Sequence, residues 1–351
     1  MPVRSIKIMN LLAFQDHFTL TFSDGINVII GGNGTGKTTL LKMIYTAAQW
    51  SAKPVRPGKN KSFHQYFSHA LSDACLTNHD KNTRTHSAFA VSDGKHTLTY
   101  CLAPQERVDA QDWINLNISS VFIPTTEMLS HAKGFLALNE KYDMPFDDTQ
   151  IDILINASLP ETRVCSPYYA AILKELSNVI DGEVIFEHDI FYVVKKDGRK
   201  IDFALEAEGL RKLALLWKLI RNGLLEQGAI LLWDEPEANL NPELFPLVAK
   251  ILLTLQENGI QIFLATHSYH FAKYLELLRT QKEQVLFHDL HKDTFPAKSD
   301  TPSSSRTIHG KSACCIEELE PNHLSDADEK LLDLVYREKV QNLSQNQRKA
   351  D

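Results

Sequence analysis

The chain has 351 residues, of which 43% are hydrophobic and 23% charged, which is the composition of a folded globular protein and excludes a disordered chain. Its formal net charge of -7 excludes nucleic-acid binding through overall charge, so any such contact needs a local basic patch. The five cysteines form no CxxC pair, which argues against a zinc ribbon or a disulfide framework and predicts a reducing compartment. No run approaches the roughly 20 apolar residues that cross a bilayer, so we expect a cytoplasmic protein with no membrane contact.

The N-terminal segment predicts three strands, a glycine-rich loop and a helix. Two β-rich runs, Val3 to Ile8 and Phe18 to Phe22, precede the continuous apolar run Ile26 to Ile30. The loop Gly31 to Thr39 follows that third strand directly, and the apolar residues after it recur at helical spacing. A strand, a glycine-rich loop and a helix in this order are the context that a phosphate-binding loop requires.

The middle of the chain predicts a basic loop, a hairpin and a helical lobe. Polar and basic residues between Trp50 and Asp73 indicate a surface loop. The runs Thr85 to Val91 and Thr97 to Leu102 flank a turn sequence, which predicts an antiparallel flap beside the nucleotide core. A buried strand, Ser119 to Ile123, leads into a segment from Thr125 to about Lys174 that is mainly helical and broken by two prolines.

The C-terminal half alternates predicted strands and helices. A hairpin of two strands, Val184 to Lys195 and Lys200 to Leu205, precedes an amphipathic helix that starts near Gly209. Strands at Ala229 to Trp233 and Gln261 to Ala265 enclose a helix at Pro242 to Glu257, and this alternation predicts a parallel sheet. The remaining predicted elements are a strand near Val285 to Phe287, a run at Ala313 to Leu319 and a helix from Asp326 to about Val340.

The glycine-rich loop matches the pattern G-x-x-x-x-G-K-[ST], in which successive backbone N–H groups and a helix N-terminus bind phosphate. It predicts ATP and Mg²⁺ as cofactors, with the Lys37 ammonium on the β- and γ-phosphates and the Thr38 hydroxyl on Mg²⁺. The expected nucleotide-binding residues of the loop are Gly31, Asn33, Gly34, Thr35, Gly36, Lys37, Thr38 and Thr39.

A pair of acids is predicted where the strand Ala229 to Trp233 ends. Asp234 and Glu235 follow this buried strand directly, at the edge where parallel sheets bind ligands. Asp234 is expected to hold the Mg²⁺ shell beside Thr38. Glu235 is expected to polarise the attacking water, because phosphoryl transfer depends on placing that water and neutralising the γ-phosphate.

The order of these motifs resembles that of ABC-type P-loop ATPases. The stretch Asp234 to Pro242 reads D-E-P-E-A-N-L-N-P and resembles a Walker B motif followed by a D-loop. Ala265 to Ser268, A-T-H-S, resembles a switch-histidine motif. Together with G-G-N-G-T-G-K-T-T, these variants are similar to the RecF, SMC and OLD-like branch and its small bacterial AAA/ABC proteins, many found in anti-phage defence systems. The resemblance covers about residues 1–340.

The resemblance implies an α/β fold, an ABC ATPase head with a mixed central sheet, an antiparallel β flap and a helical lobe. It implies that His267 senses the γ-phosphate as a third catalytic residue beside Glu235 and Lys37, and that Asn239 and Asn241 link two sites across a dimer. One split domain over residues 1–340 is expected rather than two domains in series. Its expected parts are 1–118 (P-loop and flap), 119–205 (helical insert and hairpin), 206–290 (signature helix to switch histidine) and 291–340 (C-terminal strand and helix), followed by a flexible tail at 341–351.

Two motifs depart from the family pattern. The stretch Glu206 to Lys212 matches the signature motif but has Ala207 where a serine is usual. Contact with the nucleotide of a second protomer is therefore expected through the backbone of Gly209 in trans, with Arg211 and Lys212 as further candidates. The glutamine loop has no glutamine, and Glu127 is either its substitute or a helix-start residue that the helix dipole favours.

These expectations lead to a nucleotide-dependent switch. We expect a homodimer or larger homo-oligomer that hydrolyses ATP at its interface and controls a separate nuclease or toxin in bacterial anti-phage defence. The alternative is a RecF-like DNA-binding ATPase of DNA repair, with nucleic acid on the loop Lys53 to Lys61. A transporter subunit is disfavoured because the signature serine is missing and the helical lobe is present. A nuclease would use the cluster Asp147, Asp148 and Asp152, which a solvated helix face explains better.

Overall fold

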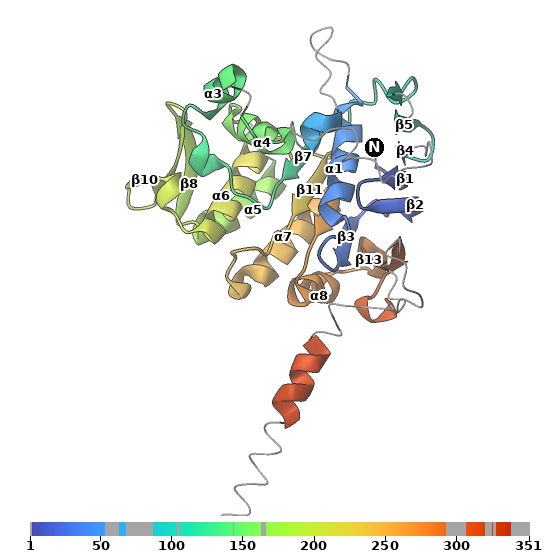
Figure 1. Cartoon of the computed structure of the whole chain (residues 1–351). Coiled ribbons are helices and arrows are strands. Elements are labelled where there is room, and N and C mark those ends of the chain that lie inside the picture. The colour runs from blue at the N-terminus through green and yellow to red at the C-terminus, as the bar shows by residue number, and fades with distance from the viewer. Residues whose placement is uncertain are drawn as a thin grey trace, which may run out of the picture.

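The computed structural model describes residues 2–52, 63–67, 87–103, 106–142, 144–162, 166–292, 307–319, 325 and 328–337. A six-stranded sheet runs through the middle of the molecule, with an antiparallel sheet on one side and a lobe of helices on the other (Figure 1). This is the α/β fold of a P-loop ATPase head with a mixed central sheet, as the sequence predicts. The division of the chain into one split domain stays a prediction.

The central sheet has the order β14-β13-β3-β12-β11-β7. Neighbouring strands run parallel except at the β13–β14 edge, which is antiparallel. Asp234 lies opposite Ala265, and Ala265 lies opposite Ile29, so β3, β12 and β11 end at the same edge. The strands are β3 (Ile26–Gly31), β7 (Ser120–Ile123), β11 (Ile230–Asp234), β12 (Gln261–Ala265), β13 (Val285–Lys292) and β14 (Ile308–Ala313).

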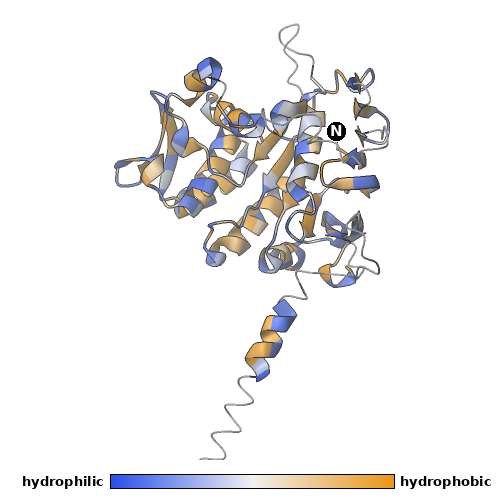
Figure 2. Cartoon of the chain, in the orientation of Figure 1, coloured by the Kyte–Doolittle hydropathy of each residue, from blue (hydrophilic) through white to orange (hydrophobic). Residues whose placement is uncertain are grey.

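Both faces of the central sheet are covered, which is why its inner strands are continuous apolar runs (Figure 2). Alternate side chains point to opposite faces: Ile29 packs with helix α1 and the antiparallel sheet, whereas Val28 and Ile30 pack with the helical side. The helices that position the site are α1 (Lys37–Gln49), α6 (Glu208–Arg221), α7 (Phe245–Glu257) and α8 (Tyr269–Leu278). The sequence did not identify α8 as an element.

The predicted flap hairpin is part of a larger antiparallel sheet with the order β2-β1-β4-β5-β6. The hairpin is confirmed for the described residues, while its expected first residues before Ser87 lie outside them. The short strand β6 was not predicted. The strands are β1 (Ser5–Leu11), β2 (Phe14–Thr21), β4 (Ser87–Ser92), β5 (Thr97–Ala103) and β6 (Arg107–Asp109).

The helical lobe contains α3 (Phe135–Tyr142), α4 (Asp148–Ser158) and α5 (Pro167–Val179). It also contains a three-stranded sheet of β8 (Gly182–Glu187), β9 (Ile190–Lys195) and β10 (Lys200–Asp202). The predicted two-stranded hairpin is therefore wrong in one respect. The chain turns already at His188 and Asp189, which both have a positive φ, and this turn has no glycine to mark it. Phe203–Leu205 forms a short 3₁₀ helix instead of the end of a strand.

The interpretation of the acidic cluster as a solvated helix face is wrong, because this face of α4 packs on α1. Asp147 caps α4 and forms an ion pair with Lys42 at 2.7 Å, and Asp152 accepts a hydrogen bond from the Tyr45 hydroxyl at 2.9 Å. Asp148 is buried. Across the described ranges, no group of three or more His, Cys, Asp or Glu side chains is placed to hold a metal ion.

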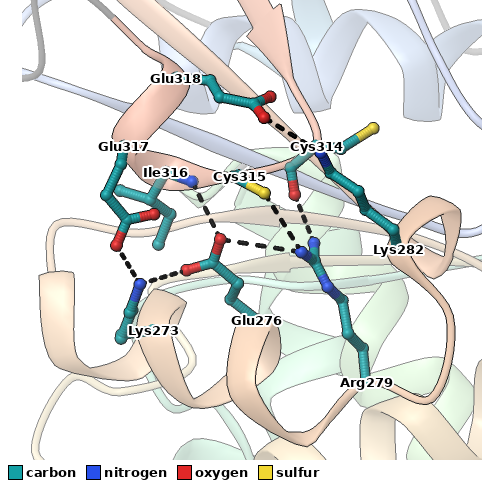
Figure 3. A network of polar contacts seen from close by, with 9 residues as sticks. All are labelled: Lys273, Glu276, Arg279, Lys282, Cys314, Cys315, Ile316, Glu317 and Glu318. Carbon is teal, nitrogen blue, oxygen red and sulfur yellow. Dashed lines mark hydrogen bonds and ion pairs between the residues drawn. The ribbon is translucent and has the colours of Figure 1, made fainter.

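The C-terminal segment is docked on α8 by a network of charged side chains (Figure 3). Lys273 pairs with Glu276 at 2.6 Å and with Glu317, while Arg279 donates to the backbone carbonyl of Cys314. The predicted run at 313–319 is the end of β14 followed by a 3₁₀ turn, Ile316–Glu318. Residues 328–337 are helical, inside the range expected for the last helix.

None of the helices in the described part of the chain is long and apolar enough to cross a membrane.

Gln261 ties the N-terminal segment to the central sheet. Its side chain is 3% exposed, and it accepts from the backbone N–H of Val3 and donates to the carbonyls of Val3 and Ser23, each at 2.8 Å. We expect Gln261→Leu to lower the free energy of unfolding by about 3 kcal/mol, because it leaves buried backbone groups without partners.

Urea denaturation measures this difference. Gln281→Leu is the control, because Gln281 is exposed and its replacement should change the free energy of unfolding by less than about 0.5 kcal/mol. Equal unfolding midpoints for wild type and Gln261→Leu would contradict the role given to Gln261.

Candidate functional site

The phosphate loop has a backbone that only glycine can adopt at its tightest points. Gly31, Gly34 and Gly36 have φ angles of 143°, 71° and 88°. A Cβ on Gly31 would lie 2.3 Å from the Leu290 carbonyl oxygen, and one on Gly36 would lie 2.9 Å from the Phe14 ring. Asn33, Gly34 and Thr38 are exposed at the rim of this loop, and Thr39 is half-buried in the first turn of α1. The loop therefore fits a triphosphate gripped by backbone N–H groups.

The Lys37 side chain folds back over the phosphate loop, and its contact with the phosphates stays a prediction. It is 6% exposed, and its Nζ donates to the carbonyls of Gly31 and Gly32 at 2.9 and 3.0 Å. Burial lowers the pKa of Lys37 to about 8, and the nearby charges of Asp234 and Glu235 oppose that shift. The Thr35 hydroxyl donates to the Gly32 carbonyl at 2.9 Å and stiffens the same turn. A positive charge is thus held at the centre of the loop.

The two predicted metal ligands meet. The Thr38 hydroxyl donates to Asp234 Oδ2 at 2.8 Å, although 196 residues separate them in the chain. Burial raises the pKa of Asp234 in spite of this hydrogen bond and one from Thr125. A hydroxyl and a carboxylate are the hard oxygen ligands that Mg²⁺ prefers, and Mg²⁺ keeps its other positions for phosphate and water. The donor set therefore fits Mg²⁺ between the loop and β11.

The two remaining candidate catalytic residues also lie together. Glu235 follows β11 with a φ of 50°, and its Oε1 lies 3.4 Å from Nε2 of His267, which follows β12. Burial, and then the charge of Lys37, lower the pKa of His267, so the imidazole is neutral at pH 7. A carboxylate and a neutral imidazole thus share the edge at which Lys37 and Asp234 stand.

The signature stretch packs against the D-loop of the same chain. A Cβ on Gly209 would lie 2.6 Å from the backbone oxygen of Asn239, and the Asn239 side chain donates to Glu208 at 2.8 Å. The turn that begins α6 and the D-loop therefore form one surface, which requires glycine at position 209. The cap that Gly209 would place on a second protomer's nucleotide stays a prediction.

The basic residues that follow Gly209 face their own protomer, so the expectation of contact in trans is corrected for both. Lys212 is buried, and its Nζ donates to the Glu235 carbonyl at 3.0 Å. Arg211 pairs with Glu127 at 3.0 Å. Glu127 also accepts from the backbone N–H groups of Leu129 and Ser130, so it is the helix-start residue of a 3₁₀ turn, Leu129–His131.

Three further residues at this edge were not assigned their place from the sequence. Glu237 Oε1 accepts from the Thr266 hydroxyl at 2.6 Å and from the His267 backbone N–H at 3.0 Å. Lys292, at the end of β13, places its Nζ 3.3 Å from where a Cβ on Gly34 would stand. Lys212 completes the set. The E in D-E-P-E was a signal for Glu237, whereas nothing local in the sequence marked Lys292.

Comparisons with known proteins agree with the motif order. The family model described as "AAA domain, putative AbiEii toxin, Type IV TA system" matches residues 109–272, and another described as "AAA domain" matches residues 5–131. No curated protein matches the chain.

Solved structures of similar fold include an SMC head bound to the C-winged helix domain of ScpA (11% identity, TM-score 0.48, covering 89% of this chain and 98% of that one). Others are the SMC head domain from Thermotoga maritima (14%, 0.41, 89% and 99%) and an ATP-binding cassette of an ABC transporter in its ADP conformation (13%, 0.37, 82% and 87%).

The fold and the site define the class of protein. A phosphate loop after β3, adjacent acids after β11 and a histidine after β12 meet at one edge of a mostly parallel sheet. The chain has the fold of a P-loop ATPase head, its motifs stand in the order that the sequence analysis describes, and the two AAA-domain family models match residues 5–131 and 109–272, which lie on both halves of the site.

Replacing Asp234 tests the expected metal site. We expect Mg²⁺ to raise the affinity of the wild-type protein for ATP, and Asp234→Asn to reduce that gain by about 10- to 100-fold, because a neutral amide replaces a charged ligand. Calorimetric titration with ATP, once with Mg²⁺ and once with a chelator, measures the gain directly.

Asp152→Asn is the control, since Asp152 is a half-buried acid that binds Tyr45 rather than Thr38. It should keep the full gain. An Asp234→Asn protein that responds to Mg²⁺ like wild type would remove Asp234 from the metal site.

Proposed function

We propose that the protein hydrolyses ATP as a nucleotide-dependent dimeric switch that controls a separate effector, a nuclease or a toxin, in bacterial anti-phage defence. The observation that carries the ATPase proposal is the meeting of Lys37, Thr38 and Asp234 with Glu235 and His267 at one edge of the sheet. ATP with Mg²⁺ is the proposed ligand, and the cytoplasm is the proposed location.

Each residue has a proposed role in hydrolysis. Lys37 and the backbone of the phosphate loop bind and orient the phosphates, and Thr38 with Asp234 would hold Mg²⁺, which neutralises phosphate charge. Glu235 polarises the attacking water. His267, neutral and within reach of Glu235, orients that carboxylate and senses the γ-phosphate. Because phosphoryl transfer relies on positioning and charge, these groups are the ones that one protomer would contribute to hydrolysis.

The proposed dimer places ATP between two copies of the chain. The surface formed by Gly209 and the D-loop supports this arrangement, because Asn239 and the start of α6 are held together and are presented as one unit. Gly209 is buried against the backbone of Asn239 and Leu240, which leaves no room for a side chain at this position. A second copy supplying this surface would cap the nucleotide through backbone N–H groups, without the serine that transporter ATPases use.

The effector role rests on two observations. One matched family model carries a putative toxin and a type IV TA system in its description. In the described part of the chain, no group of three or more His, Cys, Asp or Glu side chains is placed to hold a metal ion, and the effector that we propose is a separate protein. The RecF-like alternative needs the basic loop Lys53 to Lys61, which lies outside the described residues.

Glu235→Gln tests both hydrolysis and the dimer. We expect it to lower kcat by about 100-fold or more, because the amide no longer polarises the water, and to leave ATP binding intact. Trapped ATP should then hold the dimer, so that size-exclusion chromatography with light scattering reports a doubled mass with ATP and Mg²⁺ and a single mass without nucleotide.

Glu226→Gln, which changes an exposed acid before β11, should behave like wild type. A Glu235→Gln protein that is monomeric in every nucleotide state would contradict the dimer. The RecF-like alternative makes a different prediction for the wild-type protein. Duplex DNA should then stimulate its ATPase activity, and the affinity of the protein for DNA should fall steeply as the salt concentration rises.

A further inference from the structure

Lys212 is a lysine, a residue that normally carries a positive charge, and it is almost completely buried. It lies on α6, it is 2% exposed, and its Nζ donates to the backbone carbonyl of Glu235 at 3.0 Å. Burying an ammonium group is unfavourable unless nearby charges and hydrogen bonds compensate it. The acids Glu237, Glu235 and Glu208 provide that compensation. The ammonium is therefore directed at the Walker B acids and away from solvent.

The carbonyl that Lys212 binds belongs to a residue in a constrained conformation. Glu235 has a φ of 50°, which residues other than glycine rarely adopt, and its carboxylate direction follows from that backbone. A hydrogen bond to its own carbonyl is a direct way to hold the backbone there. Small displacements matter at this point, since a shift of about 1 Å in a reacting group can cost about 100-fold in rate.

The partner of Glu235, His267, is held by a contact of its own. Glu237 accepts from the Thr266 hydroxyl and from the His267 backbone N–H through the same oxygen, Oε1. Glu235 and His267 stand 3.4 Å apart, and each is held by a separate contact: Lys212 donates to the Glu235 carbonyl, and Glu237 accepts from the His267 backbone N–H. This arrangement fixes the distance between carboxylate and imidazole without using either functional group as a tether.

Lys212 also stands one helical turn from the proposed capping surface. Gly209 packs its backbone on the Asn239 oxygen, and Glu208 accepts from the Asn239 side chain. Residues three positions apart on a helix lie on neighbouring parts of the same face. Movement of the start of α6 against the D-loop therefore reaches the Glu235 carbonyl through a single side chain.

We propose that Lys212 is a positioning residue that aligns Glu235 for hydrolysis and couples this alignment to the engagement of α6 by a second copy of the chain. The inference rests on the proposed function, because it requires that Glu235 act in ATP hydrolysis. In each protomer, the element that caps the partner's nucleotide and the acid that serves its own nucleotide are then joined by Lys212.

The test compares three substitutions on α6 with wild type in steady-state ATPase assays. Lys212→Met keeps an apolar stem of similar length and removes the ammonium. We expect kcat to fall by about 30- to 100-fold, with KM for ATP changed by less than about threefold. Lys212→Arg retains a charged donor, and we expect it to recover kcat to within about fivefold of wild type.

Lys218→Met is the matched control, because Lys218 is a second buried lysine on α6 that pairs with Glu161 at 2.9 Å, away from Glu235. It should lower the unfolding temperature about as much as Lys212→Met and keep kcat within about twofold. Chromatography with ATP and Mg²⁺ should show accumulated dimer for Lys212→Met, as for Glu235→Gln, because binding persists while turnover is slow.

Unchanged kcat in folded Lys212→Met, or an equal loss in Lys218→Met, would overturn the inference and leave the proposed function intact. A rise in KM with unchanged kcat would overturn it as well, since that result assigns Lys212 to binding. If Lys212→Met does not fold, Lys212→Gln decides on the same terms, because it keeps a polar group that is too short to reach the carbonyl. A wild-type protein that binds ATP without hydrolysing it would instead refute the proposed function.

Discussion

The hydrogen bond between Thr38 and Asp234 is the contact on which the site depends. It joins the first residue after the P-loop lysine to the end of β11, at 2.8 Å and across 196 residues. The two can meet because β12 lies between β3 and β11 and all three strands end at one edge. The parallel strands are covered on both faces, so this edge of the sheet is rigid. The loops that follow the strands are therefore held in place at their first residues.

The charges at this edge partly compensate one another. Two ammonium groups, on Lys37 and Lys212, stand among the carboxylates of Asp234, Glu235 and Glu237, and burial shifts the pKa of each lysine downward and of Asp234 and Glu237 upward. Burying any one of these charged groups alone would be unfavourable. Burying them together is less so, because opposite charges lie close to one another where little solvent reaches. The set is therefore prepared to exchange partners when a triphosphate and a divalent cation enter.

Sequence patterns predicted the parts whose signal is local. The phosphate loop, Asp234 with Glu235, and His267 each follow an apolar strand, and the structure places them where that pattern requires. The parts that failed depend on tertiary packing: Asp148 on α4 is buried, and Lys212 on α6 turns inward and donates to the Glu235 carbonyl. The sequence of an amphipathic helix does not show which of its charged residues will contact a buried backbone carbonyl.

The order of strands in the central sheet also has a consequence for how the chain is made. The phosphate loop leaves the ribosome early, but the neighbours of β3 in the sheet are β12 and β13, which are synthesised after residue 260. Vectorial synthesis therefore leaves β3 and α1 without their flanking strands until most of the polypeptide has emerged. The edge of the sheet that holds the ATP site can therefore form only after β12 has been synthesised.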